Sequence, residues 1–231
     1  MSSEQSGPII QCENLVKIYK TPDTEVLALQ GLEITIDRGE LMAIIGNSGS
    51  GKSTFLNMIG GLDRPSAGKL IVDGKDLFKL NERELVDYKR RTVGFVWQNN
   101  ARNLLPYLTA WQNIQMPMLF EKGERKKERA LELLDMVGLS KRKNNRLSQL
   151  SGGEQQRVAI ARAIAHKPKV LFADEPTGAL DTNTGLAMVK LFRDLTEQEG
   201  VTIVMTTHDP GLMELGDQVY ELEGGELIHG E

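Results

Sequence analysis

One stretch of this 231-residue chain decides its fold: Gly46-Asn47-Ser48-Gly49-Ser50-Gly51-Lys52-Ser53-Thr54. Its glycines, lysine and serine have the spacing of a phosphate-binding loop, in which backbone N–H groups converge on an anion. The apolar run at 41–45 predicts a buried strand before the loop, and residues 54–59 predict a helix after it. Because a helix N-terminus adds positive charge, the stretch predicts triphosphate binding, with Lys52 at the β- and γ-phosphates and Ser53 on Mg²⁺.

The composition is that of an ordinary globular chain, with 40% hydrophobic and 26% charged residues. A net charge of −4 gives no support for a nucleic-acid partner, and basic runs such as 89–91 read as solvated faces. The single cysteine, Cys12, excludes an intrachain disulfide and fits a reducing compartment. No apolar run approaches the roughly 18 residues that span a bilayer, and residues 1–5 lack the form of a signal peptide. We therefore expect a cytoplasmic chain that reaches a membrane only through a partner.

Strand and helix patterns follow one another on both sides of the loop. Strands are expected at 9–20, 32–36, 70–72, 93–98 and 201–205, and a closing hairpin at 218–228. In the segment 93–98, Val93, Phe95 and Trp97 occupy alternate positions, which in a strand places their side chains on one face. Helices are expected at 82–91 and 124–137, the second burying Ala130, Leu131, Leu134 and Val137 and stopping at Gly138. The segment 99–166 therefore reads as a mainly helical insertion between strands.

A second predicted anion site begins at Ser151. Ser151 and Glu154 have the spacing of a helix capping box, and we expect Pro168 to end the helix. Gly152 and Gly153 are unfavourable in a first turn, by about 1 kcal/mol each. They are explained if something must approach the backbone closely, although a well-capped helix without a ligand remains the alternative.

Acidic residues follow the continuous apolar run at 170–173, which predicts a strand buried on both faces. Asp174 and Glu175 lie at its carboxyl end, where open α/β sheets bind ligands. Successive side chains diverge, so we assign Asp174 to Mg²⁺ and Glu175 to polarising a water. His208 follows the next buried strand at the same edge, although such a histidine, taken alone, is more often structural. Tyr19 ends the first strand and either stacks on an adenine ring or is an ordinary strand aromatic.

In combination, these motifs resemble those of the ATPase subunits of ATP-binding cassette (ABC) transporters, in the same order and over nearly the whole chain. The resemblance rests on the phosphate loop, Gln98, the Leu-Ser-Gly-Gly-Glu-Gln-Gln-Arg run at 150–157, Asp174-Glu175, Ala179-Leu180-Asp181 and His208. More narrowly, Gly60-Gly61-Leu62-Asp63 and the run at 173–181 resemble the macrolide-export and lipoprotein-release branch. That branch also includes antimicrobial-peptide resistance ATPases and a cell-division ATPase.

The resemblance implies an α/β fold, a P-loop NTPase (RecA-like) core with an N-terminal antiparallel β subdomain and an inserted α-helical subdomain. It implies a single domain over 1–231. Residues 1–98 and 167–231 would form the nucleotide-binding core with the β subdomain, and residues 99–166 the helical subdomain that carries the 150–157 signature.

The resemblance also implies roles for single residues. Residues 46–54 would bind the triphosphate of ATP, and Tyr19 would stack on its adenine. Ser53, Gln98 and Asp174 would hold Mg²⁺, Glu175 would be the general base, and His208 would contact the γ-phosphate. Asp181 would lie at the interface of two subunits. Tyr107 and its apolar neighbours resemble a face that receives a membrane permease, although packing within the loop explains them equally well.

The number of anion sites gives an argument independent of the resemblance. The chain has one phosphate loop but two predicted anion sites, so we expect Ser151, Gly152, Gly153 and Glu154 to cap the γ-phosphate of ATP held by another copy or a homologous ATPase. Two copies facing head to tail would then bury two ATP–Mg between them.

The expected function is ATP hydrolysis that drives a separately encoded membrane permease, from the inner face of the cell membrane. A regulatory or mechanical ATPase that acts through a membrane partner without transport is the alternative. A GTPase or small-molecule kinase is disfavoured because no Asn-Lys-x-Asp guanine reader occurs in the sequence. A repair or translation ATPase is disfavoured because a coiled insertion or second cassette is lacking.

Overall fold

The computed structural model describes residues 7–98, 103–119, 125–178, 180–208 and 216–230. Its strands are β1 (Ile10–Lys20), β2 (Glu25–Ile36), β3 (Leu41–Ile45), β4 (Ala67–Val72), β5 (Lys75–Asp76), β6 (Val93–Val96), β7 (Val170–Ala173), β8 (Thr202–Thr207), β9 (Gln218–Glu223) and β10 (Glu226–Gly230). Its helices are α1 (Lys52–Ile59), α2 (Glu82–Arg91), α4 (Ala110–Gln115), α5 (Arg125–Met136), α6 (Gly152–Ile164) and α7 (Thr182–Glu199), with short 3₁₀ turns at Met116–Met118, Ser140–Arg142 and Leu147–Gln149.

Strands β1, β2, β4 and β5 form an antiparallel sheet in the order β2-β1-β4-β5. Ile10 in the central strand pairs with Ile36 on one side and with Val72 on the other. Leu32, Ile34 and Ile36 are buried and alternate with polar residues, which confirms the half-buried strand predicted there. The antiparallel strands predicted on both sides of the phosphate loop therefore belong to one sheet.

The second sheet contains six strands in the order β10-β9-β3-β8-β7-β6. Neighbours from β9 to β6 are parallel, and β10 returns antiparallel to β9 as the predicted closing hairpin. Parallel pairing brings the carboxyl ends of β3, β6, β7 and β8 to one edge. The segments that leave this edge are 46–51, 97–98, 174–178 and His208, so the topology gathers the predicted site residues.

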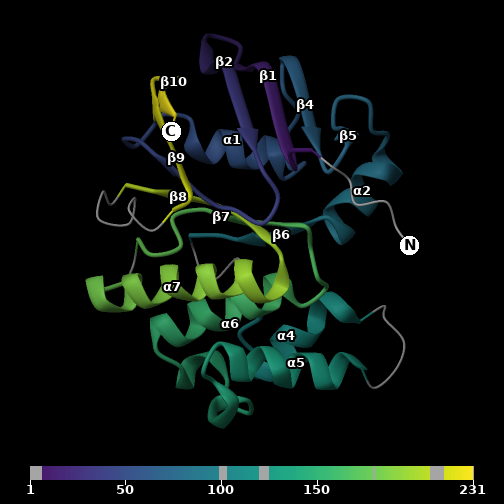
Figure 1. The fold of residues 1–231 in the computed structure, drawn as a ribbon, viewed down its shortest axis with the longest axis vertical. Helices are drawn as coiled ribbons and strands as arrows, with labels where there is room; N and C mark the ends of the chain where they lie inside the picture. The colour runs from purple at the N-terminus through teal and green to yellow at the C-terminus, as the bar shows by residue number, and fades with distance from the viewer. Residues whose placement is uncertain (1–6, 99–102, 120–124, 179, 209–215, 231) are drawn as a thin grey trace.

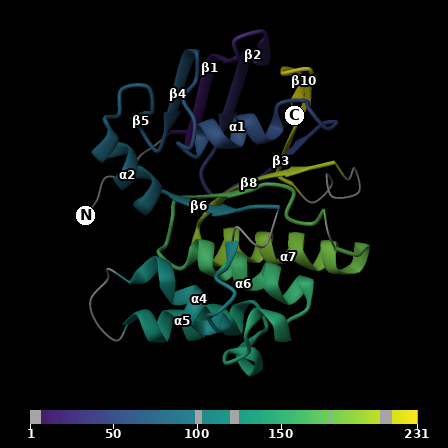
Figure 2. The same ribbon diagram turned by 180° about the vertical axis from the view of Figure 1, so that it is seen from behind.

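Helices cover the six-stranded sheet on both faces. Figures 1 and 2 show α1 between the two sheets, and α7, α6, α4 and α5 below the six-stranded sheet. Along β3, Met42 and Ile44 pack in the core that contains α1, whereas Leu41 and Ala43 pack in the core that contains α4 to α7. Burial on both faces explains why β3 and β7 are continuously apolar. No helix in the described ranges has the length and apolarity that a bilayer crossing requires.

The structure corrects three sequence predictions. In α5 the buried residues are Ala130, Leu133 and Leu134, whereas Leu131 is 42% exposed, because α5 packs against α4 and α6 through the face centred on Leu133 and Leu134. The buried face at 93–98 does not follow strict alternation: β6 ends at Val96, and both Val93 and Val96 are buried because both faces of the sheet are covered.

The third correction concerns the end of α6. Pro168 does not itself terminate the helix, which stops at Ile164. Lys167 then takes a left-handed conformation (φ 55°), and the proline lies beyond this turn. Residue 124 of the predicted α5 helix and Ala179 of the 179–181 motif lie outside the described residues.

Candidate nucleotide site

The phosphate loop lies at the end of β3 and lines a cavity of about 610 Å³. The lining residues that the sequence predicted as site residues are Tyr19, Ser48, Gly49, Ser50, Gly51, Lys52, Ser53, Thr54, Gln98 and Glu175. Gly46 enters the loop with φ 149°, and a Cβ there would lie 2.2 Å from the Leu222 carbonyl oxygen. Only glycine therefore fits at this first position of the loop.

The ammonium of Lys52 is held inside the loop. Lys52 is only 5% exposed, and its Nζ donates hydrogen bonds to the carbonyl oxygens of Gly46 (2.7 Å) and Asn47 (2.9 Å). These carbonyls turn the side chain back over the loop. A buried positive charge at the N-terminus of α1 is a favourable environment for a polyphosphate.

Ser53 and Asp174 meet although 121 residues separate them in sequence. The hydroxyl of Ser53, in the first turn of α1, donates to Oδ1 of Asp174, which follows β7, at 3.0 Å. Hydroxyl and carboxylate oxygens are the donors that Mg²⁺ prefers, and Mg²⁺ is typically held by one or two carboxylates together with substrate phosphates. Among the described residues, no group of three or more His, Cys, Asp or Glu side chains forms a metal cluster of its own. The donor set therefore fits Mg²⁺ that arrives with a nucleotide.

Glu175 lies at the same edge of the sheet, where two other predicted site residues contact its carboxylate. Gln98 Nε2 donates to its Oε2 at 2.8 Å, and His208 Nδ1 lies 3.6 Å from the same oxygen. The backbone of Glu175 is left-handed (φ 44°), which is unfavourable for a non-glycine residue by about 1–3 kcal/mol. Strain of this kind is concentrated at functional sites, where the surrounding contacts maintain it.

Thr206 is a functional candidate that the sequence analysis missed. It is fully buried in β8, and its hydroxyl donates to Asp174 Oδ1 (2.9 Å) while accepting the backbone N–H of Glu175 (2.9 Å). A single hydroxyl thus connects both acidic residues. The only sequence signal was a threonine near the carboxyl end of β8, which does not distinguish it from the adjacent Thr207.

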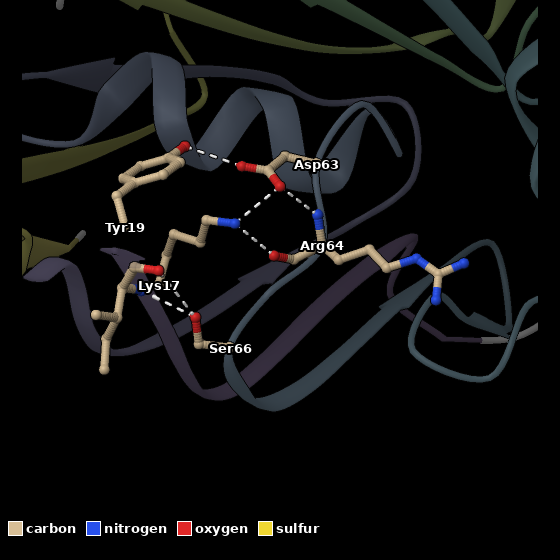
Figure 3. A network of polar contacts seen from close by, with 6 residues as sticks. Lys17, Tyr19, Asp63, Arg64 and Ser66 are labelled. Atoms are coloured by element: carbon tan, nitrogen blue, oxygen red, sulfur yellow. Dashed lines mark hydrogen bonds and ion pairs between the residues drawn. The ribbon is translucent and has the colours of Figure 1, made fainter. Parts of the chain in front are cut away.

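Tyr19 lies at the rim of the cavity, 38% exposed, at the end of β1. Its hydroxyl donates to Asp63 Oδ2 at 2.9 Å, and Figure 3 shows Lys17 completing the same network. Partial burial and the hydrogen bond to Asp63 raise the pKa of Tyr19 above its ordinary value. The structure thus places the predicted aromatic residue beside the phosphate loop, with two charged partners that the sequence analysis did not identify.

The Ser151 tip of α6 belongs to a different part of the surface. Ser151 accepts from the N–H of Glu154 and Glu154 accepts from the N–H of Ser151, which confirms the capping box. The hydrogen bond from the Ser151 N–H lowers the pKa of Glu154. Residues 151–154 are not among the described residues that line the phosphate-loop cavity.

The two glycines of this tip have different surroundings. A Cβ on Gly152 would meet nothing within 4 Å, so the backbone there is open to an approaching group. A Cβ on Gly153 would lie 2.9 Å from Thr184 Cγ2, so Gly153 also serves the packing of α6 against α7. Asp181 caps α7 by accepting hydrogen bonds from the hydroxyl and the N–H of Thr184, and these bonds lower the pKa of Asp181. Asp181 also lines a neighbouring cavity together with Glu175 and His208.

Fold and site together define a phosphate-loop nucleotide-binding protein: a glycine loop between a parallel strand and a helix, faced by acidic residues at the carboxyl edge of the sheet. Residues 29–178 match the family described as ABC transporter, and the chain belongs to that family. It is an ATP-binding subunit of the ABC transporter class, and it is an ATPase. The predicted α/β phosphate-loop NTPase fold is confirmed by solved structures of the same class.

The relatives agree with the predicted branch. The ABC transporter ATP-binding protein MJ0796 of Methanocaldococcus jannaschii is 43% identical over 96% of this chain and 97% of its own length. A structure of MJ0796 described as a dimer in a post-hydrolysis state bound to ADP and Pi matches with a TM-score of 0.86, at 41% identity over 96% and 97% of the two chains. The lipoprotein-releasing system protein LolD of Alcanivorax borkumensis is 43% identical over 96% and 97%. The macrolide export protein MacB of Bartonella quintana is 42% identical over 99% of this chain but only 34% of its own length.

Proposed function

We propose that two copies of this chain, or this chain and a homologous ATPase, pair head to tail around two ATP–Mg and drive a separately encoded membrane permease. One observation carries the proposal. The phosphate loop and Glu175 line one cavity, Glu175 and His208 line the neighbouring one, and Asp174 is bonded to Ser53 of the loop, while the open Ser151 tip lines neither cavity. The dimeric ADP- and Pi-bound structure of MJ0796 supports the pairing.

Within each copy, residues 46–54 bind the phosphates and Lys52 supplies positive charge to the β- and γ-phosphates. Ser53, Asp174 and Gln98 are the residues that would hold Mg²⁺, which supplies charge neutralisation at the phosphates when bound. Tyr19 stacks on the adenine. Ser151, Gly152, Gly153 and Glu154 of the other copy close the site over the γ-phosphate, and Asp181 lies at the interface.

Glu175 is proposed as the general base that takes a proton from the attacking water. Gln98 orients its carboxylate through the 2.8 Å hydrogen bond to Oε2. His208 contacts the γ-phosphate from the end of β8. Positioning and electrostatic stabilisation supply most of the acceleration, and proton transfer to Glu175 adds about 10²- to 10⁴-fold.

The relatives named for lipoprotein release and macrolide export favour transport over the regulatory alternative. We propose that the cargo is a lipoprotein, a peptide or a macrolide-like molecule, moved by a permease that holds the chain at the inner face of the cell membrane. The exposed Tyr107 (67%) is the candidate centre of the permease-binding face.

ATP supplies the negative charge that both anion sites bind, so hydrolysis and phosphate loss would loosen the pair.

The division of the chain remains as proposed from the sequence. Residues 1–98 and 167–231 form the nucleotide-binding core with the β subdomain, and residues 99–166 form the helical subdomain. The packing of α4 against α5 and α6 supports the helical part of this division.

The Glu175→Gln variant tests the proposed pairing. It should bind ATP with wild-type affinity, lose most of its turnover, and elute as a dimer on size-exclusion chromatography with ATP and Mg²⁺. ADP in place of ATP is the control and should leave the variant monomeric. A Glu175→Gln variant that stays monomeric at saturating ATP would contradict the proposal.

A second variant tests the role of the α6 tip. Ser151→Arg in the Glu175→Gln background should bind ATP as a monomer but fail to form the dimer, because the arginine occupies the open space beside Gly152. Ser140→Arg, at an exposed serine of the same helical segment, is the matched control and should pair normally. Equal loss of ATP binding and of pairing in Ser151→Arg would refute the shared site.

A further inference from the structure

The turn that follows α1 contains Gly60-Gly61-Leu62-Asp63, and its structure gives this run a role. The N–H groups of Leu62 (2.8 Å) and Asp63 (3.2 Å) both donate to the carbonyl oxygen of Asn57, which folds the chain back along the helix. Gly61 has φ 67°, and a Cβ there would lie 2.9 Å from Leu85 Cδ1. The glycine therefore permits the tight reversal that brings Asp63 beside β1.

Each carboxylate oxygen of Asp63 has a different role (Figure 3). Oδ1 accepts from Lys17 Nζ (2.8 Å) and from the N–H of Arg64 (2.7 Å), whereas Oδ2 accepts from the hydroxyl of Tyr19 (2.9 Å). Lys17 Nζ also donates to the Arg64 carbonyl oxygen (2.8 Å). Although partial burial opposes it, the hydrogen bond from Lys17, followed by those from Arg64 and Tyr19, lowers the pKa of Asp63. The carboxylate is thus charged and fixed from three directions.

Lys17 also contacts the ring of Tyr19. The Lys17 side chain is 10% exposed, and its Nζ lies 4.7 Å from the centre of the tyrosine ring, within the range of a cation–π interaction. Tyr19 is therefore held at two points, at its hydroxyl by Asp63 and over its ring by Lys17. A partly exposed tyrosine without such contacts would sample several rotamers.

We infer that Asp63 and Lys17 are positioning residues that hold the Tyr19 ring as a preformed platform for the adenine base. The inference rests on the proposed role of Tyr19 in nucleotide binding. A ring that is ordered before the ligand arrives loses less conformational freedom on binding, so more of the stacking free energy appears as affinity. Helix α1 carries the phosphate loop at its start and the Asp63 turn at its end. One rigid helix thus sets the distance between the base platform and the phosphate site.

The test separates the contribution of the base from that of the phosphates. Dissociation constants are measured for ATP and for inorganic tripolyphosphate, which lacks the base, in EDTA so that no hydrolysis occurs. Tyr19→Ala should weaken ATP binding about tenfold or more and leave tripolyphosphate binding unchanged. Tyr19→Phe and Asp63→Ala should each weaken ATP binding about threefold to tenfold, again without an effect on tripolyphosphate.

Tyr19→Phe keeps the ring and the Lys17–Asp63 ion pair, so it remains informative if Asp63→Ala folds poorly. Glu13→Ala is the matched control, because it removes one negative charge and an ion pair with Lys69 (2.8 Å) between β1 and β4, and neither residue is among those that line the cavity. It should leave both dissociation constants at their wild-type values.

The outcomes distinguish the inference from the proposed function. If Tyr19→Ala weakens ATP binding but Tyr19→Phe and Asp63→Ala bind ATP like the wild type, the positioning role is wrong while base stacking stands. If Tyr19→Ala has no effect on ATP binding, the proposed base site itself is wrong, and the inference fails with it. Parallel weakening of ATP and tripolyphosphate binding by Asp63→Ala would indicate general disruption and would also overturn the inference.

Discussion

Replacing Thr206 with valine should reduce both stability and turnover, because one hydroxyl serves both acidic residues of the site. Valine has the shape of threonine but can neither donate to Asp174 nor accept from the N–H of Glu175. A hydrogen bond to a charged group contributes about 1.5–3 kcal/mol, and a buried amide without a partner costs about 1–3 kcal/mol. These contributions are not additive, and the extra methyl group offsets part of them. We therefore expect the free energy of unfolding to fall by about 2–4 kcal/mol.

The effect on turnover follows from geometry. Loss of the hydroxyl leaves Asp174 Oδ1 with the hydrogen bond from Ser53 but not the one from Thr206, and it relaxes the strained backbone at Glu175. Misplacement of a catalytic group by about 1 Å can cost about 10²-fold in rate. Steady-state ATP hydrolysis should thus fall about tenfold to hundredfold, mainly in kcat. Urea unfolding gives the stability and a phosphate-release assay gives kcat.

Two variants serve as controls for this experiment. Thr206→Ser keeps the hydroxyl and should recover most of the turnover. Thr202→Val changes a buried threonine of the same strand, whose hydroxyl accepts the N–H of Gly39 at 2.9 Å, and should lose stability without losing turnover. Wild-type kcat in Thr206→Val, or the same loss in Thr202→Val, would refute the reasoning.

Three further predictions concern stability and metal dependence. Arg129→Met should destabilise the protein by about 3–5 kcal/mol in urea unfolding, because it leaves Glu199 (17% exposed) without its bidentate partner, whereas Arg91→Met, in an exposed pair with Asp87, should cost less than about 1 kcal/mol. The lowered pKa of Asp63 means that its contribution is present above its unfolded pKa of about 3.9 and is lost as pH falls through the folded value. The stability difference between wild type and Asp63→Asn should accordingly be constant near neutrality and shrink below about pH 4; a difference that persists in acid would contradict this assignment. Removing Mg²⁺ with EDTA should abolish phosphate release while ATP still protects the chain against thermal unfolding, and undiminished hydrolysis in EDTA would exclude the proposed metal role.

The features that the sequence analysis predicted correctly are those encoded by neighbouring residues. The phosphate loop is one contiguous run, so its glycines and the flanking apolar residues already specify strand, loop and helix. The capping box at Ser151 needs only residues 151–154, and the all-apolar β7 is recognisable from four residues. Local hydrogen bonding and the periodicity of burial determine these elements, and both can be read along the chain.

The tertiary structure decided the contacts between residues that are far apart in the chain. Ser53 meets Asp174 over 121 residues, Gln98 meets Glu175 over 77, and Tyr19 meets Asp63 over 44. The roles of Thr206 and Leu133 were missed for the same reason. Thr206 lies in a largely apolar strand, where nothing nearby in sequence names its partners, and the buried side of the helix that carries Leu133 depends on which neighbours the helix packs against. A pattern of polar and apolar residues predicts that a side chain is buried or needs a hydrogen-bond partner. Only the strand order and the packing of the layers determine which residue that partner is.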